Sequence, residues 1–523
     1  MKKLLALVLA CMLLSGCAAS AMMDFYGVTP FREMEYTRPD MDAIAASCQA
    51  AADLAAESGD VDAVLEAVWD FYDVYDDFST NYDLAYIHYH GDLGDEYWQA
   101  EQDFCAEHYA ELDMYLEELY CALAQSPLRG ELEEEYFGEG FFLDYEGEGM
   151  YDETLIGLLE REQELISEYY AVSDGVEAEY YTDAYFEECA LPLADILARL
   201  AALRQEIAGY VGYDSYTDFA WDFYYYRDYT PEQAAEYLEA IRTELVPLYE
   251  NMNAMEVWGP SEEWCSEKET FAYVEKTAKA MGGITQEAFN MMKLADLYDI
   301  GISDKKSGLS FELFFSKYYV PYVFVSAEGV GYDKLAFAHE FGHFACDYAS
   351  NGSWAGTDVL EIFSQGMEYL SLSYGDADED FARMKLADSL STYVEQGAYA
   401  AFELAMYELP AEELTGETLL ELYGDICTAY GFESMDWDPR DLVTVPHFYS
   451  NPQYVISYVV SNDAAMQLYE LEQSDPGVGK QAYEDNLTTE ESYFLAFLED
   501  AGLETPFERV EAVAGVMEKY FGA

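Results

Sequence analysis

Two histidines four residues apart are the strongest chemical signal in this sequence. His339 and His343 stand in the segment Leu335–His343, LAFAHEFGH, which has the pattern HExxH. Residues four apart lie one turn above each other on a helix, so both imidazoles can reach one ion. Zinc suits nitrogen ligands, and Glu340 between them can act as a general base toward a water. The apolar residues around the motif predict a buried site.

A zinc site of this kind needs a third protein ligand, which an acid on the next predicted helix can supply. Glu361 lies in the segment 357–368, TDVLEIFSQGME, where Thr357 or Asp358 is predicted to cap the helix. Apolar residues flank Glu361, and an unpaired carboxylate there would be costly unless a cation compensates it. We therefore expect one Zn²⁺ per chain, held by Glu361 and the two histidines. Another acid as third ligand stays open.

A third segment, 446–458, could supply hydrogen-bond donors to a reaction. Its sequence PHFYSNPQYVISY contains His447, the only histidine after the motif, and ends with Tyr454 and Tyr458. A neutral phenol or imidazole can donate a hydrogen bond to the oxyanion of a tetrahedral intermediate. Ordinary core packing is the alternative for each of these three side chains.

Helices are predicted to position most of these residues. Apolar residues recur three and four apart, with few glycines or prolines, over 40–130, 153–170, 185–209, 492–501 and 506–520. Thr230 followed by Pro231 predicts an N-cap and first helical position, opening a helix that runs to about Met252. The Gly-rich stretch 138–149 predicts a loop or small hairpin.

One convincing strand signal precedes the HExxH helix. Residues 318–325, YYVPYVFV, are β-branched and aromatic, and the proline within them favours an edge strand. No internal repeat is found. The predicted fold class is therefore mainly α, with a small sheet beside the zinc-site helix.

Composition excludes some functions. The chain has 523 residues and is 51% hydrophobic, so it can bury a large core as one domain or two. Its 105 acidic residues against 24 basic ones give a formal charge of -81, which argues against nucleic-acid binding. The acidity either keeps the protein soluble or steers cationic peptides toward it. Nine cysteines without a CxxC pair predict neither a disulfide framework nor a zinc-thiolate site.

Residues 1–17 are predicted to be a targeting segment. Lys2 and Lys3 precede the apolar run Leu4–Leu14, which is too short to remain as a membrane span. The following Ser15-Gly16-Cys17 completes a resemblance to the lipobox of bacterial lipoproteins, in which the cysteine is lipidated and becomes the mature N-terminus. An ordinary cleaved signal is the alternative. We expect an extracytoplasmic protein attached to the bacterial membrane through lipid on Cys17.

The three chemical segments, in their order, resemble the M3 family of zinc peptidases, the thimet oligopeptidase and oligoendopeptidase F group. Together with weaker similarity from Gly212 to the Thr230 helix, the resemblance covers roughly residues 200–523. Two positions depart from the family pattern. Cys346 stands where the family commonly has histidine, and the interval from His343 to Glu361 is shorter than usual.

The resemblance implies a helical ellipsoid with a deep channel, open to short peptides and closed to folded proteins. It also implies that the strand 318–325 pairs with the peptide backbone. Tyr458 becomes the favoured oxyanion donor, with His447 and Tyr454 secondary.

We divide the chain accordingly into the leader 1–17, an N-terminal helical region 18–200 and a catalytic region 201–523. The expected function is zinc-dependent hydrolysis of peptide bonds in short peptides. A dipeptidyl carboxypeptidase of related architecture is one alternative. A surface lipoprotein that binds peptides without cleaving them is the other. No oligomeric state is predicted.

Overall fold

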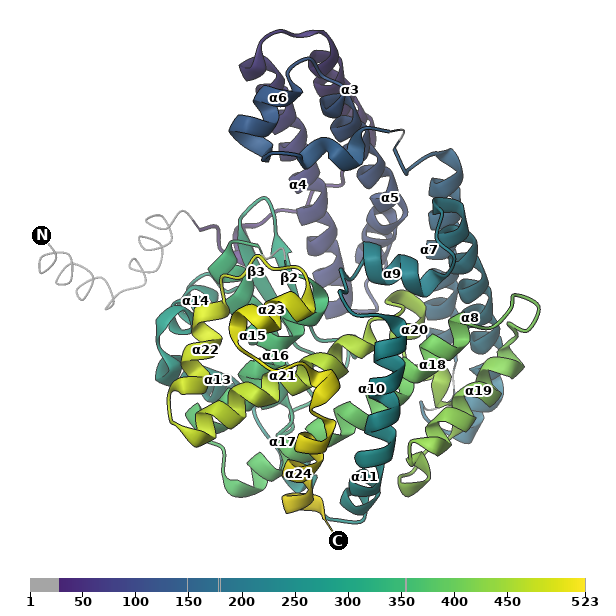
Figure 1. Cartoon of the computed structure of the whole chain (residues 1–523), viewed down its shortest axis with the longest axis vertical. Helices are drawn as coiled ribbons and strands as arrows, with labels where there is room; N and C mark the ends of the chain where they lie inside the picture. Colours follow the sequence, from purple (N-terminus) through teal and green to yellow (C-terminus); the bar gives the residue numbers. More distant parts are fainter. Residues whose placement is uncertain (1–27, 148, 177, 179, 353–354, 523) are drawn as a thin grey trace, which may run out of the picture.

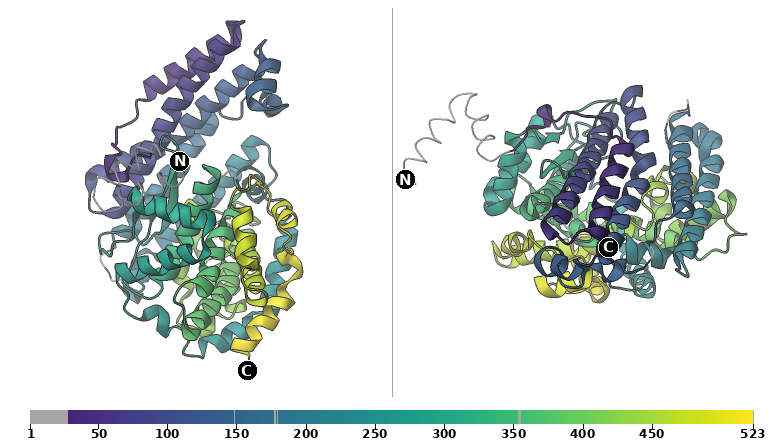
Figure 2. Two further views of the ribbon diagram at one scale, coloured as in Figure 1. Left: turned by 90° about the vertical axis from the view of Figure 1, so that its left-hand side faces the viewer. Right: turned by 90° about the horizontal axis from the view of Figure 1, so that it is seen from above.

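The structure is a computed structural model that describes residues 28–147, 149–176, 178, 180–352 and 355–522. The predicted leader and Cys17 lie outside these residues. The fold is mainly α, as predicted, with one small sheet (Figures 1 and 2). Its α-helices are α3 (Met41–Glu57), α4 (Val61–Gly91), α5 (Glu96–Ala124), α6 (Arg129–Leu132), α7 (Glu153–Asp174), α8 (Asp183–Val211), α9 (Tyr216–Phe223), α10 (Pro231–Glu244), α11 (Val246–Asn253), α12 (Gly259–Glu262), α13 (Glu267–Met281), α14 (Gly283–Leu294), α15 (Asp333–Ser350), α16 (Thr357–Tyr374), α17 (Glu379–Ser391), α18 (Gly397–Tyr407), α19 (Gly416–Ala429), α20 (His447–Ser450), α21 (Val455–Ser474), α22 (Val478–Asn486), α23 (Phe494–Ala501) and α24 (Val510–Phe521).

Helices α3, α4 and α5 form a projection from the main body of the molecule (Figure 1). Buried apolar residues of these helices, with Leu132 and Phe142 after them, make a hydrophobic core separate from that of the body. Of the two alternatives for 138–149, the loop is confirmed and the hairpin is wrong, because the described residues there form turns and the 3₁₀ segment Phe141–Tyr145. Its Phe142 packs into the core of the projection, and this burial favours a compact turn over an extended hairpin.

One continuous hydrophobic core fills the body, from Met34 near the start of the described chain to Phe521 near its end. The predicted Thr230 helix begins as expected, with a capping box between Thr230 and Gln233. It ends early, however, and α11 follows α10 after Leu245. Pro247 near the start of α11 lacks a backbone N–H and cannot continue the α10 ladder.

The sheet corrects one prediction about the strand before the HExxH helix. Its order is β1 (Tyr298–Asp299), β3 (Val320–Phe324), β2 (Phe311–Phe315), with β1 parallel and β2 antiparallel to β3. The strand signal therefore belongs to the middle strand, not to an edge. β2 pairs with all five residues of β3 on one side, and β1 pairs with Val323 and Phe324 on the other. Among the described strands, β2 is the five-residue strand at the end of the sheet.

The position of Pro321 explains how a proline fits a middle strand. The backbone N–H of Val323 donates to Leu297 on the β1 side at 3.1 Å. Pro321 lies two residues earlier, so its nitrogen points to the same side. That side is still unpaired there, because β1 begins only opposite Val323. The missing N–H therefore costs no ladder hydrogen bond.

Three helices of the body bring together the segments that the sequence singled out. Helix α16 lies between α15 and α21 and packs against both, while β2 and β3 pack against α15. The HExxH motif, Glu361 and Tyr458 thus lie on three adjacent helices. Within the described ranges, no helix is both long and apolar enough to cross a bilayer.

Candidate metal centre

One buried carboxylate fixes the start of the HExxH helix. Asp333 is the first residue of α15 and is 4% exposed. Its side chain accepts the backbone N–H groups of residues 328–330 at 2.8 to 3.1 Å. A carboxylate at a helix N-terminus also interacts favourably with the helix dipole. The loop from the sheet is therefore tied to the first turn of α15, two turns before the motif.

Gly342, inside the motif, allows α15 and α16 to approach closely. A Cβ atom on Gly342 would lie 2.5 Å from the carbonyl oxygen of Phe363 and 2.6 Å from Cα of Ser364. No side chain can be placed there unless α16 moves away. This contact lies just after Glu361 in the chain and brings its carboxylate against the two histidines.

The predicted ligands His339, His343 and Glu361 do lie together. Their ligand atoms are all within 4.8 Å of one another. Oε2 of Glu361 is 3.4 Å from Nε2 of His339 and 3.8 Å from Nε2 of His343. The Glu361 side chain is 1% exposed, whereas those of the histidines are 19% and 16% exposed. The residues thus form a His-His-Glu cluster with a buried carboxylate and imidazoles that solvent can reach.

Hydrogen bonds orient two members of the cluster. Glu368, two turns after Glu361, accepts from Nδ1 of His339 at 2.6 Å. An ionised carboxylate can only accept, so Nδ1 carries a proton, and Nε2 is the nitrogen that faces Glu361. Both oxygens of Glu361 also have donors, Tyr454 OH at 2.6 Å and Ser364 Oγ at 2.8 Å.

The electrostatics of the cluster favour a cation. Burial lowers the pKa of His339, but the hydrogen bond to Glu368 and the charges of Glu361 and Glu340 outweigh it and raise the pKa to about 9. Burial raises the pKa of Glu340 to about 8, with Glu361 and Glu368 adding to the effect against His339. Burial and the neighbouring His339 lower the pKa of His343 well below its usual range, which leaves a neutral ligand. The carboxylates of Glu340, Glu361 and Glu368 thus lie around the two imidazoles, and a cation bound there would offset part of their charge.

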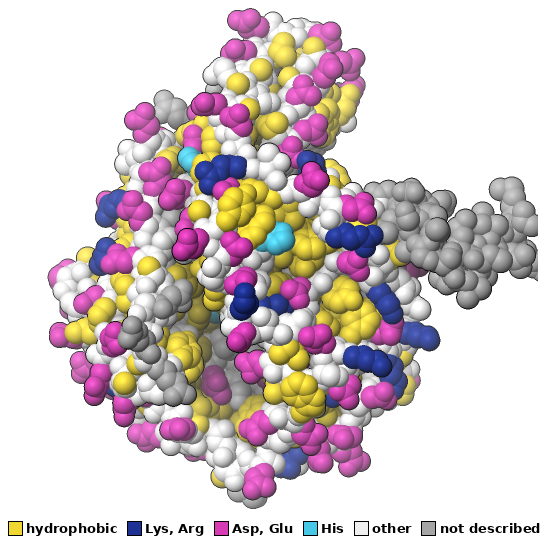
Figure 3. Space-filling model, turned by 180° about the vertical axis from the view of Figure 1, so that it is seen from behind, with side chains coloured by type: hydrophobic (Ala, Val, Ile, Leu, Met, Phe, Trp, Pro, Cys, Tyr) yellow, Lys and Arg dark blue, Asp and Glu magenta, His cyan; other side chains and the backbone are white. Residues whose placement is uncertain are grey.

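Further carboxylates continue from the motif across the sheet toward the projection. Burial, with the charges of Asp347 and Glu340, raises the pKa of Glu312 on β2 well above its usual range. Burial also raises the pKa of Asp83 on α4 to about 8. Seen from behind, the body is hollowed by a cleft with apolar and acidic side chains around it (Figure 3). The acidity of the chain thus extends close to the cluster.

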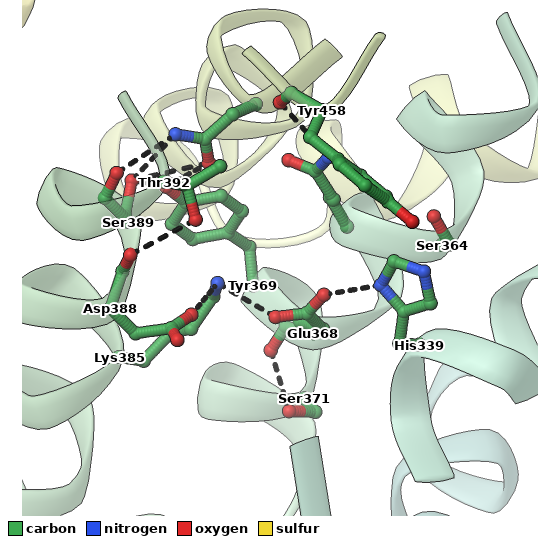
Figure 4. Close-up of polar contacts among 12 residues, drawn as sticks. His339, Ser364, Glu368, Tyr369, Ser371, Lys385, Asp388, Ser389, Thr392 and Tyr458 are labelled. Carbon is green, nitrogen blue, oxygen red and sulfur yellow. Dashed lines mark hydrogen bonds and ion pairs between the residues drawn. The ribbon is translucent and has the colours of Figure 1, made fainter. Parts of the chain in front are cut away.

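The tyrosines of segment 446–458 occupy different positions around the cluster. Tyr454 donates its hydroxyl hydrogen to Glu361, so that proton is not free for another acceptor. The hydroxyl of Tyr458 lies 3.3 Å from Nε2 of His447, and Figure 4 shows it directed toward His339 and Ser364. Burial lowers the pKa of His447 and raises that of Tyr458 well above its usual range. Both groups are therefore neutral hydrogen-bonding partners.

Two buried arginines hold this segment in place. Nη1 of Arg204 donates to the carbonyl oxygen of Phe448 at 2.9 Å, and Nη2 of Arg227 donates to that of Gln453 at 2.9 Å. Gln453 has a φ of 68°, a left-handed conformation that is unfavourable for a residue with a side chain. The surrounding hydrogen bonds therefore impose the turn that directs Tyr454 toward Glu361.

The predicted cap of the third-ligand helix is wrong. Gly356, and neither Thr357 nor Asp358, is the N-cap residue of α16. The carboxylate of Asp358 instead accepts from Nε of Arg227 at 3.3 Å and from Tyr229 OH at 2.7 Å. The hydrogen bond from a buried arginine is charge-assisted, and it draws the side chain inward.

The sequence analysis assigned no role to the residues that support the cluster. Ser364 and Glu368 stand in the segment 357–368, three and seven residues after Glu361 on the same helical stripe, and this spacing was the signal for them. The signal was weaker for Arg204, Arg227 and Lys385. Each is a basic residue among apolar neighbours, in a chain that has only 24 basic residues. Their partners are remote in sequence, so spacing alone could not identify them.

A HExxH helix packed against a helix that carries a buried carboxylate could hold a metal ion. Residues 31–148 match the family described as the Peptidase M3 N-terminal domain. The chain thus carries an M3 N-terminal domain, and the resemblance to the M3 family is confirmed. No curated protein matches the sequence.

Solved structures share the fold over most of the chain. PZ peptidase A, solved with an inhibitor, is 22% identical with a TM-score of 0.81, covering 94% of this chain and 99% of its own. A Bacillus anthracis protein assigned as an oligoendopeptidase F is 21% identical with a TM-score of 0.78, covering 94% and 98%. The M32 carboxypeptidase from Deinococcus radiodurans is 14% identical with a TM-score of 0.58, covering 86% and 98%. The fold is therefore common to peptidases named for internal and for terminal cleavage.

Proposed function

We propose that the protein hydrolyses peptide bonds in short peptides and depends on one zinc ion bound by His339, His343 and Glu361. The observation that carries this proposal is the His-His-Glu cluster, with ligand atoms within 4.8 Å of one another. The M3 N-terminal domain supports the same class of reaction.

The donor set suits zinc. Two imidazole nitrogens and one carboxylate oxygen are the ligands of many catalytic zinc sites, which leave a position for water. Ligand atoms at about 2.0–2.2 Å from a shared ion lie within a few ångströms of one another, as the three donors do here. The Glu368 hydrogen bond to His339 is the outer partner that zinc-binding histidines usually have. When bound, zinc would polarise the scissile carbonyl and lower the pKa of a water.

Glu340 is the proposed general base. It follows the first ligand directly, is 7% exposed and has a pKa raised to about 8. Its carboxylate would take the proton of the attacking water and deliver it to the leaving amine. This double role needs a group whose pKa lies near neutral pH when the metal is bound, because the group both accepts and returns a proton.

Tyr458 is the proposed donor to the oxyanion. If Nε2–H of His447 donates to the phenol oxygen, the hydroxyl hydrogen of Tyr458 is available to substrate. Tyr458→Phe is expected to lower kcat by roughly 10²–10³-fold with little change in KM, because an oxyanion contact forms mainly in the transition state. Steady-state kinetics on a quenched peptide measure both constants. A variant with unchanged kcat would remove Tyr458 from this role.

Tyr454→Phe is the matched control for Tyr458→Phe. Its hydroxyl is already bonded to Glu361, so its loss is expected to weaken metal binding. At saturating zinc, kcat should fall less than in Tyr458→Phe. Equal losses of kcat in both variants would contradict the separate roles that we assign to the hydroxyl groups of Tyr454 and Tyr458.

Digestion of a mixture of short peptides and one folded protein tests the proposed function. We expect cleavage of the peptides alone, loss of cleavage with a chelator and recovery with added zinc. Peptides that bind without being cleaved would indicate the peptide-binding lipoprotein instead. Cleavage that a chelator does not affect would contradict the metal mechanism.

The same digestion distinguishes internal from terminal cleavage. An endopeptidase cuts peptides whose C-terminus is amidated, whereas a dipeptidyl carboxypeptidase needs the free carboxylate and releases residue pairs. Mass spectra of the products identify each case. The free edge of β2, rather than β3, is the place where we propose that the peptide backbone pairs.

A further inference from the structure

A buried lysine lies beyond the metal cluster, on the far side of Glu368. Lys385 is on α17 and is 2% exposed. Its Nζ lies 2.7 Å from Oε2 of Glu368 and 2.7 Å from Oδ2 of Asp388. The other oxygen of Glu368 accepts from His339. Figure 4 shows this continuous chain of hydrogen bonds and ion pairs.

Buried cations are scarce in this protein. Among the described residues, the lysines and arginines that are buried are Arg204, Arg227, Lys385 and Arg509. Lys385 is the one lysine in this group; the side chain of Lys306, on the sheet side of the body, is also only 4% exposed and is paired with Asp299. An ammonium is costly to bury even when it is paired, and an apolar side chain of similar size often stabilises a fold equally well. Packing alone therefore does not explain a lysine at this position.

The geometry gives Lys385 a role in orientation. A carboxylate that accepts a hydrogen bond through one oxygen can still rotate about its last side-chain bond. Lys385 holds Oε2 of Glu368, and Asp388 with the ring of Tyr369, 4.9 Å away, holds the ammonium. Both oxygens of Glu368 are thus fixed, and Oε1 stays in line with Nδ1 of His339.

We propose that Lys385 is a positioning residue that acts through Glu368 to orient the His339 ring, with Nε2 directed at the metal. This inference rests on the proposed zinc site. Outer-shell partners of metal-binding histidines typically contribute roughly 10–100-fold to metal affinity. Lys385 is one contact further away, so its contribution is expected at the lower end of that range.

Zinc affinity measured by competition with a chromogenic chelator tests the proposal. Lys385→Met is expected to weaken zinc binding about tenfold relative to the unmodified protein. Lys385→Arg, which keeps the charge, should recover part of the loss. Arg509→Met is the matched control. It removes a buried cation that lies 3.0 Å from Asp463 on α21 and is not part of the metal cluster. It should lower thermal stability and leave zinc affinity unchanged.

A double-mutant cycle separates positioning from a general structural effect. In the background of Glu368→Gln, adding Lys385→Met should cause no further loss of zinc affinity, because the residue through which it acts has already changed. The double variant removes the carboxylate and the ammonium together. If Lys385→Met alone does not fold, the double variant can still be compared with Glu368→Gln, and any further loss of zinc affinity would contradict the proposal.

Two results would overturn the inference. One is wild-type zinc affinity in Lys385→Met. The other is an equal loss from Lys385→Met in the presence and absence of Glu368→Gln. Failure of the unmodified protein to bind zinc at all would instead contradict the proposed function, so the two failures are distinguishable.

Discussion

Glu340→Gln is expected to bind zinc as the unmodified protein does and to lose nearly all peptide hydrolysis. Glutamine has almost the same shape as glutamate but cannot take a proton from water at neutral pH. General-base catalysis contributes roughly 10²–10⁴-fold, so a loss of that order is expected in kcat. Initial rates on a quenched peptide, together with zinc content by elemental analysis, measure the two properties separately.

A second glutamate-to-glutamine variant is the control that shows whether the loss of turnover is specific to Glu340. Glu328→Gln removes one exposed carboxylate from the loop before the same helix and should leave turnover unchanged. Substantial turnover in Glu340→Gln would contradict its assignment as the base. Loss of zinc from that variant would show that Glu340 supports the metal instead.

His343→Ala is expected to lose the bound metal as well as activity. The change removes one of three proposed ligands from a cluster whose remaining donors cannot fill the gap, since Glu361 and His339 are fixed by hydrogen bonds. The loss of zinc affinity should exceed the roughly 10–100-fold typical of an outer-shell partner. Zinc stoichiometry after dialysis at a fixed free zinc concentration measures this.

His447→Ala is the control for the ligand assignment. His447 lies beside Tyr458 in the same region, but it is outside the His-His-Glu cluster. It should therefore retain one zinc per chain while losing some activity. Retention of one zinc per chain by His343→Ala, or loss of zinc from His447→Ala alone, would require a different ligand set.

The cluster itself was predictable because its pattern is local. The interval of four residues between His339 and His343 places both on one helical face whatever surrounds the helix. Glu361 was predicted as the third ligand because it lies on the next apolar helix. The short connection between the two helices must keep them close together. Segment 446–458 was recognised from its residue types and from the order of the motifs. Helix identity and the mainly α class also follow from apolar spacing along the chain.

The strand 320–324 shows what a local sequence pattern cannot predict. Residues 320–324 were recognisable as a strand, but whether a strand is an edge depends on partners elsewhere in the chain. Here those partners are Tyr298–Asp299 and Phe311–Phe315. A proline normally indicates an edge, and this one is accommodated because β1 starts beyond it. The place of β2 at the end of the sheet is why we propose it as the strand that pairs with a peptide.

Helical spacing and residue chemistry, both encoded within short stretches of chain, were enough to indicate the proposed metal ligands, the proposed base and the class of fold. Packing decided everything that links remote stretches: the approach of two helices at Gly342, the proton of Tyr454 committed to Glu361, and Lys385 behind Glu368. The physical reason is that a helix sets the position of neighbours one turn away. Contacts between residues tens or hundreds of positions apart instead arise only when the whole core is buried.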